Sequence, residues 1–294
     1  MSMSNMTDNI IQRADIVKST ARVGAEIKNV RLSDELSDEM VRAISQLLLE
    51  HKVIFFRDQG HLDDFEQHRF ALRLGSLVTP IDMKPDRRSG HADQMHTDVS
   101  FGDQCPKISV LRGVVIPPED SDTVWSSTAG AYLDLPEPLR MLADNLWAVH
   151  CSTYDCTLTR HSEIDAKQFG DVFTGTICED ARPVVRIHPE TGERLLVLGE
   201  SVRNFVGLER YASQKLFDRL QSYLASPDNS VRWSWKPVDV VIWDNRATQR
   251  CAIGKSNDRD GVERRSIDGD VPLSIAGPRS VARSKPKLQT AKAA

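Results

Sequence analysis

Short runs of apolar, β-forming residues recur along this chain and set the strongest limit on its fold. The clearest runs lie at 53–56, 108–116, 231–235 and 238–243, with shorter ones at 184–187 and 195–198. Each is shorter than a typical helix and rich in valine, isoleucine, leucine, phenylalanine or tryptophan, which favours strands. The chain is therefore predicted to be mainly β.

Apolar residues at helical spacing predict a few helices between these strands. Two stripes share one helical face each: Leu36, Met40, Ile44, Leu47 and Leu48, and then Leu139, Leu142, Ala143, Leu146 and Trp147. Further helices are expected over 62–75, where Gly75 is the stop signal, and over 210–224. Many short strands with few helices favour a β-rich barrel or sandwich with flanking helices.

The order of these segments predicts a single domain, because no repeat or linker divides the chain. Residues 1–20 are expected to form an N-terminal lead and residues 21–276 the domain itself. The polar stretch 152–181 is predicted to be a long insertion or lid. Residues 277–294 carry lysine and arginine but no acid, and are predicted to be a disordered basic tail.

The composition excludes several classes of protein. Of the 294 residues, 40% are apolar and 27% charged, which is sufficient for a sizeable core. A formal net charge of −4 argues against a nucleic-acid partner. The chain has an odd number of cysteines and no CxxC pair, so we expect a reducing cytoplasm rather than a disulfide framework. Neither a signal peptide nor membrane association is predicted.

His96-Thr97-Asp98 is the sharpest local feature for chemistry. Residues i and i+2 of a strand point to the same side, so this imidazole and carboxylate can meet at one metal ion. With a remote histidine they would form the facial triad of non-haem Fe(II) oxygenases. The sequence HxD also arises by chance, and the alternative is a surface turn or a satisfied polar pair.

The stretches around this motif resemble a known family. HTDVSF at 96–101 resembles the first metal motif of the taurine dioxygenase (TauD/TfdA) family, which uses Fe(II) and 2-oxoglutarate. Further matches follow in order: SDTVWSST at 121–128, LPEPL at 135–139, VRIHPETG at 185–192 and WDNRATQ at 243–249. Together they span about residues 22 to 275, and the resemblance is closest to bacterial alkylsulfatase-type members.

This resemblance implies a fold, cofactors and substrates. The implied core is a double-stranded β-helix, or jelly roll, and the implied cofactors are Fe(II) and 2-oxoglutarate. His96 and Asp98 are then two iron ligands, and Thr123 helps to hold 2-oxoglutarate. O₂ would oxidise a small anionic organosulfur substrate, an alkyl sulfate or a sulfonate such as taurine. Relatives are commonly homo-oligomers, so a homo-oligomer is expected.

The chain departs from the family pattern where the third ligand should stand. In the family, the last motif is followed at once by the distal histidine ligand. Here that position is Arg250, and no histidine follows His188. The family arginine that binds 2-oxoglutarate aligns with Asp260, next to Arg259, and the arginine for the substrate oxyanion aligns with Arg264. The segment before the first metal motif is also shorter than in relatives.

Two functions of different classes follow from this departure. A guanidinium is always protonated and has no lone pair to donate, so only Cys251, Asp260 or Glu263 is available nearby as a substitute ligand. The preferred hypothesis is a dioxygenase that hydroxylates an alkyl sulfate or sulfonate at the carbon next to the heteroatom. The alternative is a catalytically impaired homologue that binds an anion or a partner subunit. A third is a different metal-dependent chemistry.

The other notable side chains have structural interpretations. His150 and His188 are predicted to be hydrogen-bonded structural residues, and His91 a loop residue. The tryptophans are predicted to be core or rim aromatics, and the cysteines buried small hydrophobic residues.

Overall fold

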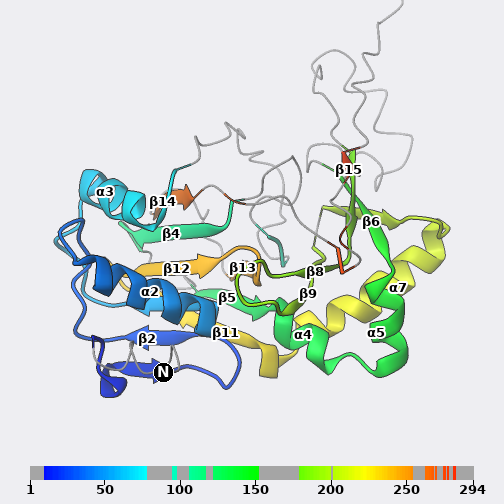
Figure 1. The fold of residues 1–294 in the computed structure, drawn as a ribbon, viewed down its shortest axis with the longest axis horizontal. Helices are drawn as coiled ribbons and strands as arrows, with labels where there is room; N and C mark the ends of the chain where they lie inside the picture. Colours follow the sequence, from blue (N-terminus) through cyan, green and yellow to red (C-terminus); the bar gives the residue numbers. More distant parts are fainter. Residues whose placement is uncertain are drawn as a thin grey trace, which may run out of the picture.

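Strands predominate in the structure, and helices flank them (Figure 1). The computed structural model describes residues 10–77, 95–97, 106–116, 122–151, 179–199, 201–253, 262–267, 269, 274–275, 277 and 281–282, with side chains omitted at 151, 179–180, 262–264 and 281–282. Most of the predicted loop at 76–94 and of the predicted lid at 152–181 lies outside these residues. Within the described chain, no helix combines the length and apolar character needed to cross a membrane.

A six-stranded sheet forms the centre of the molecule. Its strands follow the order β1 (Ile16–Lys18), β2 (Ala25–Ile27), β3 (Val53–Phe56), β12 (Val240–Asp244), β4 (Ile108–Gly113) and β14 (Val262–Ile267). All neighbours are antiparallel except β2 and β3. Every residue of β3, β4 and β12 is buried, which agrees with their largely apolar sequences.

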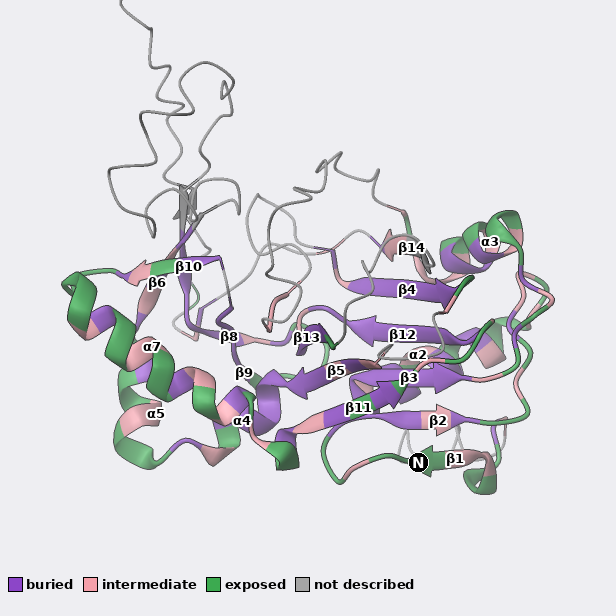
Figure 2. Ribbon diagram, turned by 180° about the vertical axis from the view of Figure 1, so that it is seen from behind, coloured by how far each residue is buried: buried purple, intermediate pink, exposed green. Residues whose placement is uncertain are grey.

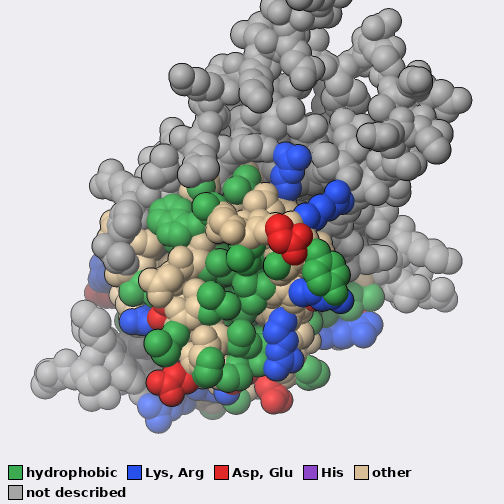
Figure 3. All heavy atoms as spheres, turned by 90° about the vertical axis from the view of Figure 1, so that its right-hand side faces the viewer, with side chains coloured by type: hydrophobic (Ala, Val, Ile, Leu, Met, Phe, Trp, Pro, Cys, Tyr) green, Lys and Arg blue, Asp and Glu red, His purple; other side chains and the backbone are tan. Residues whose placement is uncertain are grey.

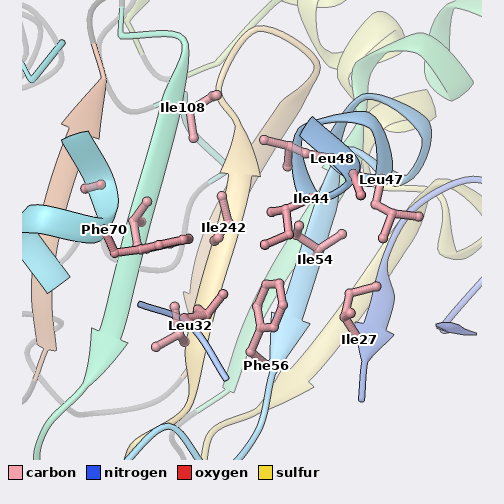
Figure 4. Close-up of a cluster of buried hydrophobic side chains, with 14 of the residues drawn as sticks. Ile27, Leu32, Ile44, Leu47, Leu48, Ile54, Phe56, Phe70, Ile108 and Ile242 are labelled. Atoms are coloured by element: carbon pink, nitrogen blue, oxygen red, sulfur yellow. The ribbon is translucent and has the colours of Figure 1, made fainter. Parts of the chain in front are cut away.

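Two helices, α2 (Asp38–His51) and α3 (Asp64–Leu74), cover one face of this sheet. Ser37 caps α2, and Asp63 and Glu66 form a capping box at the start of α3. Figure 4 shows the apolar cluster between helices and sheet, including Ile44, Leu47 and Leu48 of α2, Phe70 of α3, and Ile54, Phe56 and Ile242 of the strands.

A three-stranded sheet packs on the opposite face. Its strands follow the order β11 (Ser230–Ser234), β5 (Asp122–Ser127) and β13 (Thr248–Ile253). The buried cluster between the two sheets is rich in aromatic rings: Val23, Val53, Phe55, Leu111, Trp125, Val231, Trp233, Val241 and Trp243. Phe55 stacks on Trp233 with 4.1 Å between ring centroids. Buried residues predominate in β5 and β13, whereas β11 alternates buried and more exposed residues (Figure 2).

A further layer closes one end of the molecule. It contains a four-stranded sheet in the order β10 (Val202–Phe205), β6 (Trp147–Cys151), β7 (Glu179–Pro183) and β15 (Val281–Ala282), and a pair formed by β8 (Val185–Ile187) and β9 (Arg194–Leu196). Helices α4 (Thr128–Asp134), α5 (Glu137–Asp144) and α7 (Arg210–Leu224) share one apolar cluster with these strands. Figure 3 faces this end and shows hydrophobic side chains among lysine and arginine side chains.

Short 3-10 turns, η1 (Arg13–Asp15) and η3 (Pro227–Asn229), complete the described elements. The predicted strands at 53–56, 184–187, 231–235 and 238–243 and the helix at 210–224 are confirmed within about a residue or two. The predicted strand at 108–116 is shorter and ends at Gly113.

Two features of the sequence were interpreted wrongly. Trp147 begins strand β6 rather than ending a helix, because α5 stops at Asp144 and only Ala143 of that helix is fully buried. Strands β13 and β14 and helix α4 were not predicted, since their polar or small residues form no apolar run. In addition, Val281–Ala282 of the predicted disordered tail pair with β7.

Candidate functional site

His96 lies directly beside Arg250, although the two are far apart in the sequence. The His96 N–H donates to the Arg250 carbonyl oxygen at 2.9 Å, and the Arg250 N–H donates to the His96 carbonyl oxygen at 2.8 Å. In such a hydrogen-bonded antiparallel pair the two side chains stand on the same side of the ladder, with Cβ atoms about 5 Å apart. The first metal motif and position 250 are therefore neighbours, as the family pattern requires.

Strand β13 carries Arg250 into the space between the two sheets. Arg250 pairs with Trp125 of β5, a residue of the inter-sheet core that is fully buried. The guanidinium carbon of Arg250 lies 5.6 Å from the centre of the Trp243 ring, and the whole residue is only 6% exposed. An aromatic face attracts a cation in this arrangement. Position 250 therefore holds a buried positive charge.

Thr123 belongs to the same face of the three-stranded sheet. It stands opposite Ala252 and Trp233, two residues along β5 from Trp125. The Trp235 indole N–H donates to the Thr123 hydroxyl oxygen at 2.9 Å. The hydroxyl hydrogen can still be donated to a bound carboxylate. The part of Thr123 in holding 2-oxoglutarate stays a prediction.

Gly199 and Gln249 fill the space on another side of this site. Gly199 has φ +133°, and a Cβ there would lie 3.6 Å from the Met95 carbonyl oxygen and 3.7 Å from the His96 Cα. The Gln249 side-chain amide donates to the Leu198 carbonyl oxygen. The positive φ favours glycine at this position, whereas the distances are those of ordinary van der Waals contact. Gly199 therefore lies beside the backbone of Met95 and His96.

A buried network holds the turn that leads into β13. The Asp244 carboxylate accepts from His188 Nε2 at 3.0 Å, and from Arg246 through its backbone N–H at 2.8 Å and its Nη2 at 2.6 Å. Burial raises the pKa of Asp244, but hydrogen bonds from His188 and Arg246 outweigh it and lower this pKa to about 2. Arg246 also pairs with Glu190 at 2.8 Å.

The predicted structural roles of His188 and His150 are confirmed. His188 Nδ1 accepts from the backbone N–H groups of Glu190 and Thr191 at 3.2 and 3.1 Å, so Nε2 carries the hydrogen given to Asp244. His150 is fully buried and hydrogen-bonds Ser201 at 3.0 Å. Burial, and then the positive charges of Arg186 and Arg182, hold the pKa of His150 well below its usual value.

The tryptophans and the one described cysteine side chain also agree with the structural interpretation. Trp125, Trp233 and Trp243 are buried, while Trp147 and Trp235 lie at the rim. Cys251 is buried and reduced. His91 lies outside the described residues.

The described residues do not fit an iron ion. They contain no group of three His, Cys, Asp or Glu placed to hold a metal, and Asp98 lies outside them. Arg250 offers a guanidinium where the family offers an imidazole, and a guanidinium repels a dication. Even two unit charges about 4 Å apart interact by about 4 kcal/mol at an effective dielectric constant of about 20. His96 is the one member of the proposed ligand set among the described residues.

The suggested substitute ligands receive little support from the strand register. Cys251 follows Arg250 in β13, so its side chain points to the opposite face, and its sulfur contacts the Ala252 carbonyl oxygen at 3.5 Å. Position 263 pairs with Arg112, whose side chain bonds Gln67 of the covering helix α3 at 3.1 Å. Asp260 lies outside the described residues.

The two candidate anion-binding arginines are only partly placed. Position 264 lies in β14 and pairs with Leu111, a member of the inter-sheet cluster that also surrounds Trp243. Arg259 lies outside the described residues, so its part stays a prediction.

Sequence reasoning missed the network around Asp244. Its signal was present, because Asp244 and Arg246 belong to the WDNRATQ stretch and Glu190 to the VRIHPETG stretch. Both stretches were used only as marks of resemblance. A buried acid, arginine and histidine in two matched motifs would have indicated that the motifs meet in space.

Comparisons with known proteins identify the family of this chain. The family model described as "Taurine catabolism dioxygenase TauD, TfdA family" matches residues 15–252. An alpha-ketoglutarate-dependent sulfate ester dioxygenase of Pseudomonas putida is 44% identical over 277 residues, which cover 90% of this chain and 92% of that protein. An alkylsulfatase of Acinetobacter baylyi is 42% identical, with 94% of this chain and 91% of that protein covered.

A solved structure shows the same fold. The crystal structure of a taurine dioxygenase from Burkholderia xenovorans superposes with a TM-score of 0.75 at 32% identity, covering 92% of this chain and 95% of that one. The chain therefore belongs to the TauD/TfdA family of α-ketoglutarate-dependent dioxygenases, whose cofactors are 2-oxoglutarate and iron.

Proposed function

We propose that this chain acts on an alkyl sulfate ester in the α-ketoglutarate-dependent reaction of its relatives. One C–H bond next to the ester oxygen is hydroxylated, and the product collapses to an aldehyde and sulfate, while 2-oxoglutarate and O₂ give succinate and CO₂. The observation that carries this proposal is the 44% and 42% identity, over nearly the whole chain, to a sulfate ester dioxygenase and an alkylsulfatase. A sulfonate such as taurine is the second substrate class.

The two facing sheets support a jelly-roll core as part of this proposal. In such a core, β5 and β13 would form the wall that carries Thr123 and position 250, and β14 would carry position 264. Thr123 would donate its hydroxyl hydrogen to a carboxylate of 2-oxoglutarate, and Arg264 would meet the sulfate oxyanion. Arg259 is the candidate for the far carboxylate. His96 and Asp98 remain the proposed metal ligands.

One observation favours a second function. Arg250 is buried and paired with His96 at the position of the missing ligand, so the site holds a metal ion less well than those of its relatives. In that case the chain is an impaired homologue that binds 2-oxoglutarate or an organosulfur anion without oxidising it. Both functions use the same pocket and differ in turnover.

Succinate formation separates these two functions. The natural chain and Arg250→His are incubated with 2-oxoglutarate, O₂, added Fe(II) and hexyl sulfate, with taurine in a parallel reaction. We expect slow, iron-dependent succinate formation by the natural chain and at least a tenfold faster rate with Arg250→His, because the variant regains an imidazole ligand. Exposed His68→Arg on α3 serves as the control and should leave the rate unchanged.

Each outcome decides between the functions. Substrate-dependent succinate from the natural chain supports the dioxygenase. Succinate from Arg250→His alone supports the impaired homologue with a retained pocket. Failure of both proteins with both substrates, while each is folded by circular dichroism, would rule out an organosulfur dioxygenase.

A further inference from the structure

We propose that the Arg250 guanidinium replaces the metal ion as the positive charge of this site, so that the chain binds 2-oxoglutarate without a divalent cation. The ligand class is a 2-oxo dicarboxylate. This inference rests on the 2-oxoglutarate pocket of the proposed function, but it does not require turnover.

The backbone fixes Arg250 at the centre of the site. Its N–H and carbonyl oxygen are both bonded to His96, while its other side faces Trp125 of the neighbouring strand. The backbone of Arg250 is therefore held between the segment that carries His96 and strand β5. Its charged end lies 5.6 Å from the Trp243 ring centre, between the two sheets. The covalently attached guanidinium of Arg250 therefore provides a positive charge between the two sheets without a bound ion.

The chemistry of a guanidinium suits this task. A guanidinium would bind a carboxylate of 2-oxoglutarate by two parallel N–H donations, which is a short and strong arrangement. It would thereby supply the positive charge that a metal ion would otherwise supply to this ligand. Arginine has five N–H donors, so it can donate to a ligand carboxylate and to a protein acceptor at the same time.

Thr123 supplies a second donor on the same wall. Its pair with Ala252 is two positions along the ladder from the pair of Trp125 with Arg250, so Thr123 and Arg250 share a face and lie diagonally across two strands. Diagonal neighbours of this kind lie about 7–8 Å apart. A five-carbon diacid can therefore touch both side chains, with the hydroxyl and the guanidinium donating to it.

The alternative is that Arg250 has only a packing role on Trp243. The chain offers a matched comparison, because Arg57 also lies over a tryptophan, with its guanidinium carbon 3.6 Å from the Trp233 ring centre. Arg57 pairs with Asp239 at the far end of β3 and takes no part in the site. A packing role predicts similar consequences for both arginines, whereas the proposed role concerns Arg250 alone.

The test is calorimetric titration of the natural full-length chain with 2-oxoglutarate, in EDTA and again with Mn(II). We expect the natural chain to bind in EDTA, with a dissociation constant changed less than threefold by Mn(II). Arg250→Met should weaken binding in EDTA at least tenfold, and Arg57→Met should leave it unchanged. Arg250→His should bind 2-oxoglutarate only when Mn(II) is present, because it lacks the guanidinium charge. Circular dichroism checks that each variant is folded.

Two results would overturn the inference: binding by the natural chain only when Mn(II) is present, or unchanged affinity of Arg250→Met in EDTA. Iron-dependent succinate formation without metal-free binding would sink this inference and leave the dioxygenase standing. Metal-free binding without succinate formation would support the inference and remove the dioxygenase.

Discussion

Asp244 is an ionised carboxylate in a position closed to solvent. Burial alone would favour its protonated form, yet His188 and Arg246 donate to it and lower its pKa to about 2. Arg246 is itself only partly exposed and depends on Asp244 and Glu190 for its hydrogen bonds. This set of charges fixes the turn that directs β13, and with it Arg250, toward His96.

Asp244→Asn should lower the free energy of unfolding by about 3–5 kcal/mol at pH 7, because it leaves the Arg246 charge without its buried partner. The pKa of Asp244 is lower in the folded state than in the unfolded state, so its stabilisation is complete above about pH 4 and is lost as pH falls toward 2. The difference in free energy of unfolding between the natural chain and Asp244→Asn should therefore decrease by about 1 kcal/mol from pH 6 to pH 3.

Urea unfolding at pH 6 and pH 3 measures this gap. Asp58→Asn is the control, because Asp58 is exposed and its positive φ of 58° suits asparagine. A gap that stays constant or widens as pH falls would contradict the assignment of a low pKa to Asp244.

At the scale of elements, strand β5 separates two roles on its two faces. Thr123 and Trp125 point toward the inter-sheet core, where the site lies, and Trp235 donates to the Thr123 hydroxyl. Ser126 points the other way, and its hydroxyl lies 2.8 Å from that of Ser230. Because successive side chains of a strand point to opposite faces, a substitution on one face of β5 should change ligand binding, and one on the other face should change only packing.

Thr123→Val should raise the dissociation constant for 2-oxoglutarate about five- to tenfold, because one hydrogen bond to the ligand, worth about 1 kcal/mol, is removed. Ser126→Ala, three residues along the same strand, should leave this constant unchanged even if it lowers stability. Calorimetric titration of both variants measures the effect. Equal weakening by both would show that β5 affects binding only through general stability.

At the scale of the whole molecule, the facing sheets and the end layer are in direct contact, and a single domain stays a prediction. Strand β5 of the facing sheets continues directly into α4, and α4 contacts β9 and α7 of the end layer. Four tryptophans lie in or against the inter-sheet cluster, whereas α5 and α7 belong to the other cluster. Tryptophan fluorescence therefore reports mainly on the facing sheets, whereas helical circular dichroism reports on α4, α5 and α7 of the end layer as well as on α2 and α3.

Leu224→Ala in α7 should lower the free energy of unfolding by about 2–5 kcal/mol, because its side chain is fully buried and leaves a cavity. If the layers unfold together, the urea transitions seen by fluorescence and by circular dichroism should coincide and shift equally. Leu133→Ala, at a leucine that is 62% exposed, should change stability by less than about 0.5 kcal/mol. A shift confined to the circular dichroism signal would show separate domains.

The sequence by itself determined the elements that are defined by local pattern. Apolar runs identified β3, β11 and β12, a helical stripe identified α2, and the stop signal at Gly75 identified the end of α3. The motifs also located His96 and showed that Arg250 replaces a histidine, because residue identity at a fixed offset needs no coordinates.

Only the tertiary structure decided how these pieces meet. Strands β13 and β14 have polar sequences, and they are strands because neighbouring strands pair with their backbones rather than because their side chains are apolar. The pairing of His96 with Arg250, and the joining of Asp244 to His188, follow from sheet register across distant segments. Register is a long-range property, set by which faces must be buried together, and a local pattern does not contain it.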